Sequence, residues 1–444
     1  MSSYVELHCH SNYSFLDGAS FPQELLLRAQ ELGMPALALT DHDGLYGMVK
    51  FIMAAREIGI KPIIGAELTL DGGYHLTLLT QDQIGYSNLC RLITRAQLDH
   101  EKGDPSLAWK HLDELTSGLL ALSGCHRGEI AQCLIRGDTK GAMEATQRYL
   151  EVFRPERFWI EVQRHMVGYD HPLSNDLIAL AKELGIGCVA TNNVHYATPE
   201  SRPLQDVLTS IKHNTPLDEL GARRRPNSEF YLKSTKEMLE LFPDHPEAVT
   251  NSLRIAEQCQ LDLNFTEHRL PKFPLPAGSS VFKYLRWLCY EGARRKYHPL
   301  SRRVIDQLEH ELSVIRRVGL EDYFLLVWDI CRYAHQHNIP AQGRGSAAGS
   351  IVAYVLDITR VDPIEHGLLF ERFLSEERGT IPDIDIDFSR EGREEVIQYV
   401  YRRYGENHAA MVCTVITFQA RSAIREVGKA LGFPPDLLDR IAKS

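Results

Sequence analysis

Residues 381–388 read Ile381-Pro382-Asp383-Ile384-Asp385-Ile386-Asp387-Phe388, and acidic and large apolar side chains alternate along them. A period of two is typical of a β-strand, so the three aspartates share one face and the apolar residues share the other. Neighbouring carboxylates on that face lie roughly 6–7 Å apart, because each residue adds about 3.3 Å. A buried row of like charges requires cations, and two divalent metals about 3.5–4 Å apart support phosphoryl and nucleotidyl transfer. The alternative is a solvated edge strand whose acids discourage pairing with another strand.

A glycine-rich turn precedes this strand. Residues 343–350 read Gly-Arg-Gly-Ser-Ala-Ala-Gly-Ser and lead into a predicted helix at residues 351–356. Glycines let the backbone curl around an anion, and the amides at a helix start carry partial positive charge that favours a phosphate. Ser346 can cap that helix, and Arg344 can add a charge-assisted contact. Small residues also permit close helix packing, and the turn lacks the Gly-Lys-Ser/Thr of a P-loop. Combined with the acidic strand, the turn predicts a nucleoside-triphosphate transferase.

The first two hundred residues alternate between strand and helix patterns. Strands are expected at residues 4–8, 36–40, 62–70, 74–80, 119–123, 158–162 and 187–191. Helical patterns separate most of them, and repeated strand–helix units predict parallel strands with helices outside. About seven such strands favour a β/α barrel.

Metal-ligating residue types gather at the ends of these strands. They are His8, His10, Asp17, Asp41, His42, Glu67, His75, Cys125, His126, His165, Asn193 and His195. The C-terminal ends of barrel strands converge on one rim, so we expect these side chains to meet there. Imidazole and carboxylate suit zinc, manganese or iron, often in multinuclear sites that keep a water for hydrolysis. A single histidine is more often a hydrogen-bonded or surface residue, but histidines at five strand ends favour a metal centre.

Composition sets broad limits. At 444 residues, the chain is long enough for about two or three domains, and its formal charge of −10 does not by itself favour nucleic-acid binding. Acidic metal sites can supply much of that charge. Nine cysteines without a Cys-x-x-Cys pair predict reduced thiols and a cytoplasmic protein. No apolar run is long enough for a membrane span, so we expect no membrane partner. Three basic clusters, at residues 223–225, 294–296 and 302–303, are more typical of solvated surfaces than of phosphate contacts.

The rim motifs resemble those of the polymerase-and-histidinol-phosphatase (PHP) family. The resemblance rests on His8-Cys9-His10, Thr40-Asp41-His42, Gly65-Ala66-Glu67 and Asn192-Asn193-Val194-His195. It implies a distorted seven-stranded β/α barrel whose rim holds up to three metal ions, Zn²⁺ or Mn²⁺. The implied ligands are His8, His10, Asp17, His42, Glu67, His75, Cys125, Asn193 and His195. Asn193 stands where the family usually has aspartate and is a neutral, weaker ligand. Cys125 stands where some members have histidine, and a soft metal accepts it.

The glycine turn, the acidic strand and Phe370-Glu371-Arg372-Phe373-Leu374 between them resemble the palm of the bacterial C-family DNA polymerases, the polymerase III α subunits. In that family a PHP domain precedes the palm. The resemblance implies that Asp383 and Asp385 are catalytic ligands of Mg²⁺, with Asp387 supporting them. It also implies that Gly343, Arg344, Gly345 and Ser346 contact the triphosphate of an incoming deoxynucleotide, with Arg372 and Arg378 as weaker candidates.

The expected architecture is therefore an α/β chain, a distorted (β/α)7 barrel followed by an α+β palm fragment. We divide it into a PHP domain with a helical extension (1–270), the N-terminal part of the palm (271–414) and the start of a thumb (415–444). The expected partners are primer–template DNA, deoxynucleotides and replisome or repair-polymerase subunits. The opening motif and residues 203–208 favour the error-prone branch of the family.

Other functions stay open at this stage. In the family a third catalytic aspartate follows the thumb, and this sequence ends at Ser444 before such a residue. We therefore expect a fragment or truncated product that does not carry out template-directed synthesis alone. One alternative is a PHP metal-dependent phosphoesterase or 3′–5′ exonuclease with a regulatory appendage. Another is a metal-stabilised scaffold that holds the palm.

Overall fold

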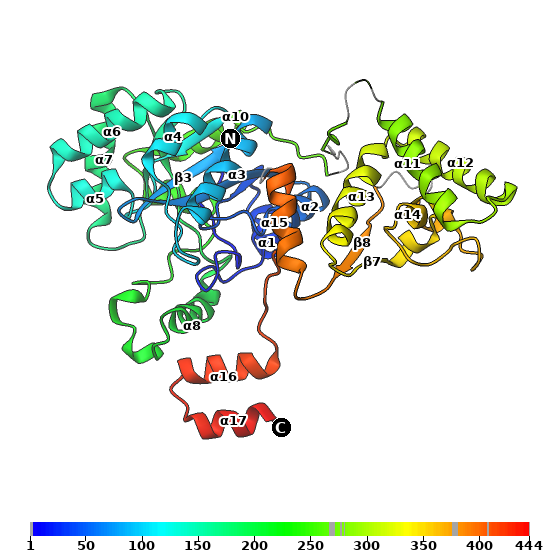
Figure 1. The fold of residues 1–444 in the computed structure, drawn as a ribbon. Coiled ribbons are helices and arrows are strands. Elements are labelled where there is room, and N and C mark those ends of the chain that lie inside the picture. The colour runs from blue at the N-terminus through cyan, green and yellow to red at the C-terminus, as the bar shows by residue number, and fades with distance from the viewer. Residues whose placement is uncertain are drawn as a thin grey trace. The chain divides into compact units, whose positions relative to one another are not determined.

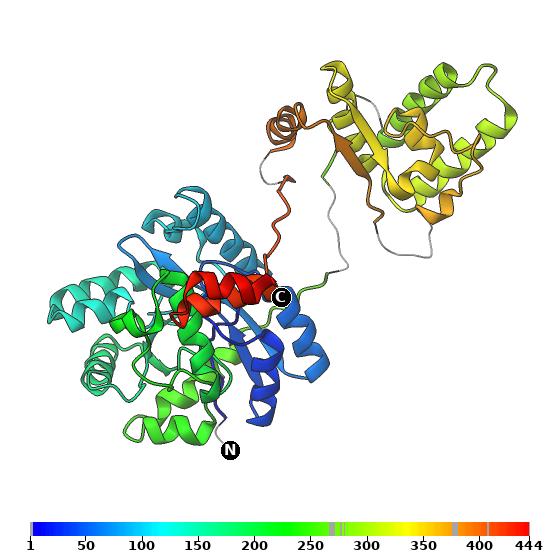
Figure 2. The same ribbon diagram turned by 90° about the horizontal axis from the view of Figure 1, so that it is seen from below.

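The structure is a computed structural model that describes residues 3–265, 271–275, 278, 280–374, 381–405 and 408–443. The chain forms two compact units (Figures 1 and 2). The first contains residues 1–263 together with 417–444, and the second contains residues 264–416. The division into three domains that we predict from the sequence stays a prediction. Arg378 lies outside the described residues.

The first unit is built on a six-stranded sheet with the strand order β1-β2-β3-β4-β5-β6. Its strands are β1 (Ala36–Leu39), β2 (Lys61–Leu70), β3 (Tyr74–Thr80), β4 (Leu119–Leu122), β5 (Phe158–Val162) and β6 (Gly187–Ala190). Helices cover it on the outside: α1 (Pro22–Glu31), α2 (Met48–Ile58), α3 (Gln83–Leu98), α4 (Trp109–Leu115), α5 (Glu129–Ile135), α6 (Thr139–Phe153) and α7 (Asp170–Leu184). The predicted strands therefore lie close to their expected positions, apart from the first.

The first predicted strand, residues 4–8, forms isolated bridges rather than a regular strand. Glu6 bridges Leu37 of β1, and Cys9 bridges Val194 just after β6, both in parallel. The His10 N–H donates to the Val194 carbonyl at 2.8 Å. This extended segment thus joins the two edges of the six-stranded sheet, which confirms the distorted barrel.

The prediction that all the strands run parallel is wrong for β3, which is antiparallel to both β2 and β4. The reason is the tight turn after β2, where Gly72 and Gly73 both have positive φ and reverse the chain within three residues. Because β3 runs in the opposite direction, its first residues lie beside the last residues of its neighbours. His75, at the start of β3, therefore lies at the same rim as Glu67.

The inward face of the barrel has an apolar end and a polar end. Ile63, Leu79 and Trp159 belong to one buried cluster, which Ile255 of α10 (Pro246–Gln258) also joins. Because side chains alternate along a strand, Glu67, His75 and Glu161 lie on this same face toward the other end. A larger core packs between the sheet and the outer helices. The sheet thus presents polar side chains at one end of an otherwise apolar interior.

Shorter elements complete the first unit. They are η1 (Pro199–Ser201), α8 (Arg202–His213), η2 (Leu217–Glu219), η3 (Gly221–Arg223), α9 (Thr235–Leu241), α16 (Ala420–Ala430) and α17 (Pro435–Lys443). Helix α16 packs against α8 and α17.

The second unit combines helices with a two-stranded antiparallel sheet, β7 (Ala341–Arg344) and β8 (Asp385–Phe388). Its other elements are α11 (Val281–Lys296), α12 (Arg302–Arg317), α13 (Glu321–Gln336), η4 (Gly345–Gly349), α14 (Ile351–Val355), η5 (Phe370–Arg372) and α15 (Arg393–Tyr404). Buried aliphatic residues of α11 to α14, together with Phe324, Phe370 and Phe373, form its core.

A buried carboxylate ties α13 to α15. Asp329 has no exposed surface and accepts hydrogen bonds from the Tyr399 hydroxyl at 2.5 Å and the Tyr404 hydroxyl at 2.7 Å. Its oxygens also lie 2.5 Å from Arg332 Nη2 and 3.6 Å from Arg403 Nε. Four donors therefore offset the cost of burying this charge.

All nine cysteines are free in the structure, and their reduced state stays a prediction. Among the described residues, no helix has both the length and the hydropathy that a membrane span requires.

Candidate functional site

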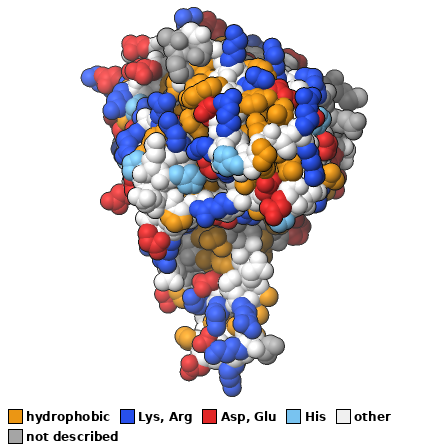
Figure 3. All heavy atoms as spheres, turned by 45° about the vertical axis from the view of Figure 1, so that its right-hand side comes forward, with side chains coloured by type: hydrophobic (Ala, Val, Ile, Leu, Met, Phe, Trp, Pro, Cys, Tyr) orange, Lys and Arg blue, Asp and Glu red, His pale blue; other side chains and the backbone are white. Residues whose placement is uncertain are grey.

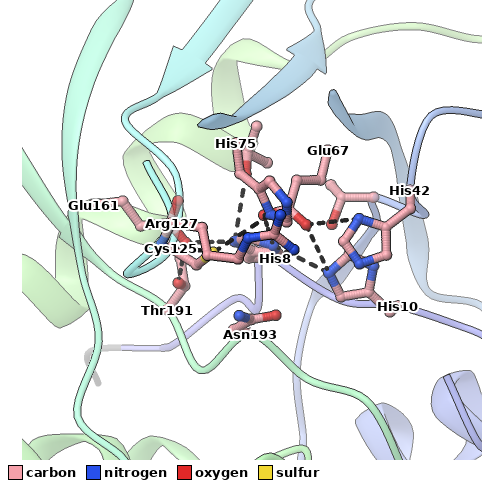
Figure 4. Close-up of polar contacts among 12 residues, drawn as sticks. His8, His10, His42, Glu67, His75, Cys125, Arg127, Glu161, Thr191 and Asn193 are labelled. Atoms are coloured by element: carbon pink, nitrogen blue, oxygen red, sulfur yellow. Dashed lines mark hydrogen bonds and ion pairs between the residues drawn. The ribbon is translucent and has the colours of Figure 1, made fainter. Parts of the chain in front are cut away.

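Glu67 lies at the centre of four histidines at the polar end of the barrel (Figure 4). Its Oε1 is 2.9 Å from His75 Nδ1 and 3.3 Å from His8 Nε2. Its Oε2 is 2.9 Å from His42 Nδ1 and 3.6 Å from His10 Nε2. The structure therefore brings together side chains from four separate segments around one buried carboxylate.

Asp17 and His195 extend the cluster. The Asp17 carboxylate lies 3.3 Å from His42 Nε2 and 3.7 Å from His195 Nε2. Arg225 donates to the same carboxylate at 3.2 Å. Together with the first four histidines and Glu67, this places seven of the predicted ligands in one connected group.

Hydrogen bonds on the outer side of three imidazoles orient them. His8 Nδ1 lies 2.6 Å from Glu161 Oε1, and His195 Nδ1 lies 2.7 Å from the Asn193 carbonyl. His10 Nδ1 lies 3.0 Å from Ser14 Oγ, whose hydroxyl donates to Asp41. Because these partners accept a hydrogen bond from Nδ1–H, the Nε2 lone pair of each ring is directed to the centre of the cluster. Metal-binding histidines are typically held in this way.

The donor set fits divalent metal ions. Three groups have ligand atoms within 4.8 Å of one another: His8, His10 and Glu67; His42, Glu67 and His75; and His10, His42 and His195. Both Glu67 oxygens and His195 Nε2 are buried without a hydrogen-bond partner, although histidine nitrogens surround the glutamate. Buried polar atoms normally have partners, so these orphaned atoms indicate ligands that converge on ions.

The electrostatics differ between members of the cluster: burial would lower the pKa of His8 and of His42, but Glu161 and Glu67 raise the pKa of His8, and Glu67 raises the pKa of His42 to about 9. Burial would raise the pKa of Glu67, but His75, His42 and His8 outweigh it and hold this pKa well below its usual range. Burial, followed by repulsion from His42, lowers the pKa of His10, and burial followed by Arg225 lowers the pKa of His195 to about 4. Near pH 7 these two imidazoles are neutral and Glu67 is ionised, which is the protonation state that metal ligands require.

Cys125 and Asn193 complete the predicted ligand set. Cys125 Sγ lies 3.6 Å from His75 Nδ1 and accepts the Arg127 N–H. Asn193 is buried, its Oδ1 has no hydrogen-bond partner, and its φ of 44° is a left-handed conformation that asparagine tolerates. Figure 4 shows the Asn193 side chain beside the histidine cluster.

Sequence reasoning missed Glu161, and it counted Asp41 among the rim residues without including it in the implied ligand set. Glu161 is a charged residue within an otherwise apolar buried strand, a signal that could have revealed it. The Asp41 carboxylate accepts from Ser11 and Ser14 and so supports the loop that follows His10. The rim residue His165 instead stacks on Phe230 and lies 2.9 Å from the Asn192 carbonyl.

In the second unit, the glycine turn and the acidic strand lie side by side. The register of β7 and β8 pairs Arg344 with Asp385 and Gly343 with Ile386. Arg344 Nε donates to Asp387 at 3.2 Å, and its Nη2 lies 3.8 Å from Asp385. The two segments on which the polymerase interpretation rests are therefore neighbouring strands of one sheet.

The acidic row is more exposed than the sequence argument assumed. Asp383, Asp385 and Asp387 are exposed, whereas the residues between them are half-buried, so the predicted alternation is present. The side chains of Asp385 and Asp387 are 54% and 67% exposed. Among the described residues, β8 pairs only with β7, so its other edge is unpaired. This environment matches the edge-strand alternative as far as burial is concerned.

The expectation that the helix after the turn offers its start to a phosphate is wrong. The buried Glu311 carboxylate accepts from Ser350 Oγ at 2.7 Å and from the Ile351 and Val352 amides at 3.0 and 3.1 Å. Ser350, not Ser346, caps α14. A carboxylate of the chain itself therefore occupies the place where an anion would bind.

The turn leaves three residues available to a ligand. Gly343 is buried, and its N–H donates to the Ile358 carbonyl at 2.8 Å. Arg344, Gly345 and Ser346 are exposed, and Gly345 has a φ of +71°. The exposed part of the turn thus lies beside the exposed acids.

Basic residues elsewhere in the second unit form local ion pairs. Arg294 lies 2.5 Å from Glu291, Lys296 lies 2.7 Å from Asp357, and Arg302 lies 2.9 Å from Asp306, measured between charged atoms. Figure 3 brings forward the side on which Figure 1 labels α11, α12 and α14, and Lys and Arg side chains there are interspersed with acidic ones. These clusters are therefore solvated helix surfaces, as their sequence pattern favours.

Two segments of the chain match known protein families. Residues 6–165 match the PHP domain family, and residues 283–444 match the family described as the bacterial DNA polymerase III alpha NTPase domain. A protein of Symbiobacterium thermophilum named error-prone DNA polymerase is 48% identical over 99% of this chain and 42% of its own length. A protein of the same name from Pseudomonas aeruginosa is 42% identical over 100% of this chain and 41% of its own length.

A solved structure of a putative metal-dependent phosphoesterase from Bifidobacterium adolescentis is 13% identical, with a TM-score of 0.33, over 55% of this chain and 96% of that one. The chain spans about two-fifths of the length of the named polymerases that it matches. Its two matched segments follow each other in the order that the sequence motifs predict. The chain therefore combines a domain of the PHP family at residues 6–165 with a domain of the bacterial DNA polymerase III alpha family at residues 283–444.

Proposed function

We propose that the chain is part of an error-prone DNA polymerase and that its second unit contributes to nucleotidyl transfer from a deoxynucleoside triphosphate to a primer 3′-hydroxyl. The observation that carries this proposal is the register of β7 and β8, which sets Arg344 opposite Asp385. The named relatives, which match nearly the whole chain, support it. Primer–template DNA, replication or repair subunits and a cytoplasmic location belong to the same proposal.

In this proposal Asp383 and Asp385 would hold Mg²⁺, for which carboxylate oxygens are suitable ligands. Bound Mg²⁺ would activate the attacking hydroxyl and neutralise the leaving pyrophosphate. Arg344, Gly345 and Ser346 contact the triphosphate. Arg344 is paired with Asp387 and Asp385 in the structure. A cation held by these aspartates would compete with that pairing and leave Arg344 available to the phosphates.

We expect Arg344→Ala to raise the dissociation constant for dATP with Mg²⁺ at least tenfold, measured by isothermal titration calorimetry. The reason is the loss of a charge-assisted contact, which contributes roughly 1.5–3 kcal/mol. The matched control is Arg393→Ala, which removes an exposed arginine of α15 in the same unit. Equal affinity of Arg344→Ala and the wild type would remove Arg344 from the triphosphate site.

A second candidate function is metal-dependent phosphodiester hydrolysis at the barrel rim. The three overlapping ligand groups around Glu67 favour it. In this proposal up to three ions, Zn²⁺ or Mn²⁺, are held by the histidines, Glu67 and Asp17, with Cys125 and Asn193 as further ligands. Bound metal would supply a hydroxide near neutral pH. The outer hydrogen bonds that the imidazoles make to Glu161, Ser14 and the Asn193 carbonyl keep the ring nitrogens in place.

We expect Asn193→Asp to increase hydrolysis of bis(p-nitrophenyl) phosphate by about tenfold or more in the presence of Mn²⁺, because a charged ligand binds the cation more tightly than an amide. Absorbance at the nitrophenolate band measures the rate, and elemental analysis measures the bound metal. Metal-loaded protein that hydrolyses nothing in either form would instead support the scaffold alternative. A fully active wild type with no gain in the variant would contradict a weakened site.

A further inference from the structure

We propose that Phe15 and Tyr46 form a platform on which an unpaired nucleobase of a DNA strand stacks while the backbone of that strand approaches the metal centre. The proposal rests on the phosphodiester function proposed for that centre. The two rings are stacked, with centroids 5.4 Å apart and an interplanar angle of 27°. Their side chains nevertheless remain 48% and 43% exposed. A stacked pair of aromatic rings thus presents a broad apolar surface to solvent.

The platform is formed by two loops that also contribute residues to the metal centre. Phe15 precedes Asp17 by two residues, and Tyr46 follows His42 by four. The Asp17 carboxylate lies 3.3 Å from His42 Nε2, which joins the two loops within the ligand cluster. Each ring is therefore carried by a loop that also carries a proposed metal ligand.

The backbone between Phe15 and Asp17 adopts an uncommon conformation. Leu16 has a φ of 57°, a left-handed value that a leucine rarely adopts. Asp17 on one side of it belongs to the ligand cluster, whereas Phe15 on the other side is exposed. Strained residues of this kind concentrate at functional sites, where the surrounding structure maintains them.

Two glycines leave room for the aromatic rings. A Cβ at Gly44 would lie 2.4 Å from the Tyr46 ring, and one at Gly47 would lie 2.7 Å from the ring of Tyr13. Tyr13 in turn lies 6.4 Å from Phe15, between ring centroids. A side chain at either glycine would therefore clash with one of these rings, and the glycines allow the rings to take their observed positions.

The chemistry of the place fits a nucleic-acid strand. A metal centre attracts a phosphodiester, and aromatic side chains bind single strands because every base has a face that stacks. The Lys50 ammonium lies 5.7 Å from the Tyr13 ring centroid and adds a positive charge that a phosphate backbone favours. A free phosphomonoester has no group that would use this apolar surface. The metal centre, the exposed rings and the lysine together therefore favour a strand with an unpaired base.

The test measures binding of a fluorescein-labelled single-stranded oligonucleotide with phosphorothioate linkages to the Mn²⁺-loaded chain by fluorescence anisotropy. We expect Phe15→Leu and Tyr46→Leu each to raise the dissociation constant by roughly 5-fold or more, since one stacked base contributes about 5- to 150-fold in affinity. Leucine keeps an apolar side chain but removes the ring. The control is Ile84→Ala, because Ile84 is 61% exposed and follows the opposite end of the antiparallel β3.

A second oligonucleotide, whose 3′-terminal residues are abasic, separates stacking from other effects. We expect the wild type to bind this abasic strand more weakly than the normal strand. Both aromatic variants should bind the abasic strand with nearly the same affinity as the wild type binds it. The platform would be overturned if both variants bound the normal strand as tightly as the wild type does. It would also be overturned if the substitutions weakened binding of the abasic strand as much as binding of the normal strand. Elemental analysis of each variant shows whether its metal centre is intact. If the wild type binds through the platform yet hydrolyses no unmodified strand, the proposed hydrolysis fails while the platform stands.

Discussion

Replacing Glu67 by glutamine is expected to weaken metal binding by at least a hundredfold. Glu67 belongs to two of the three ligand groups, and its two oxygens lie within 3.6 Å of four histidine nitrogens. Glutamine keeps the size of the side chain but removes the charge. Since substitution of residues that only support a ligand already costs about 10–100-fold in affinity, the loss of a shared ligand should cost more. Elemental analysis after dialysis against a chelator measures the metal that remains.

The control for this prediction is Glu144→Gln, which removes an exposed carboxylate from α6 with 64% of its side chain accessible. This variant should retain the metal content of the wild type. A Glu67→Gln protein that keeps its full metal content through the same dialysis would show that the cluster does not hold the ions through Glu67.

Replacing Asp329 by alanine is expected to destabilise the second unit by about 3–5 kcal/mol, because it leaves two half-buried tyrosine hydroxyls and two nearby arginines without their shared acceptor. The fully buried carboxylate accepts from Tyr399 and Tyr404 and so holds α15 against α13. A change of this size lowers the melting temperature of a unit this large by about 6–20 °C. Differential scanning calorimetry measures the shift.

Tyr399→Phe provides the graded control, because it removes one hydrogen bond and keeps the ring that stacks on Tyr333 at 3.8 Å. We expect it to cost only about 1 kcal/mol. Metal content, which depends on the first unit, should be unchanged in both variants. A melting curve of Asp329→Ala that matches the wild type would contradict the proposed role of this carboxylate.

The strands of the barrel could be predicted because their residues are buried on both sides and therefore read as short apolar runs. All four residues of β1 are buried, for example. The direction of β3 was missed although Asp71-Gly72-Gly73 is a sequence typical of a hairpin turn. The expectation of alternating strands and helices outweighed this local signal.

The ligand cluster could be predicted because it combines rare residue types at strand ends, whereas its supporting residues could not. Glu161 lies 153 positions from His8 in the sequence, and only the closed barrel brings them together. Glu311 poses the same difficulty, since its partners lie 39 to 41 residues away on a different helix. The alternation of Asp383, Asp385 and Asp387 was visible locally. Their exposure was not, because it depends on which elements cover β8.

The bridges of residues 4–10 to both edges of the sheet bear on the order in which the protein folds. These residues are synthesised well before residue 194, yet the His10 amide donates to the Val194 carbonyl. Contacts between such distant positions form slowly, because a long loop must close before they are made. His8 and His10 therefore join the other ligands only when synthesis has passed residue 195. Metal ions held through His8, His10 or His195 therefore bind after the ring has closed and do not nucleate its folding.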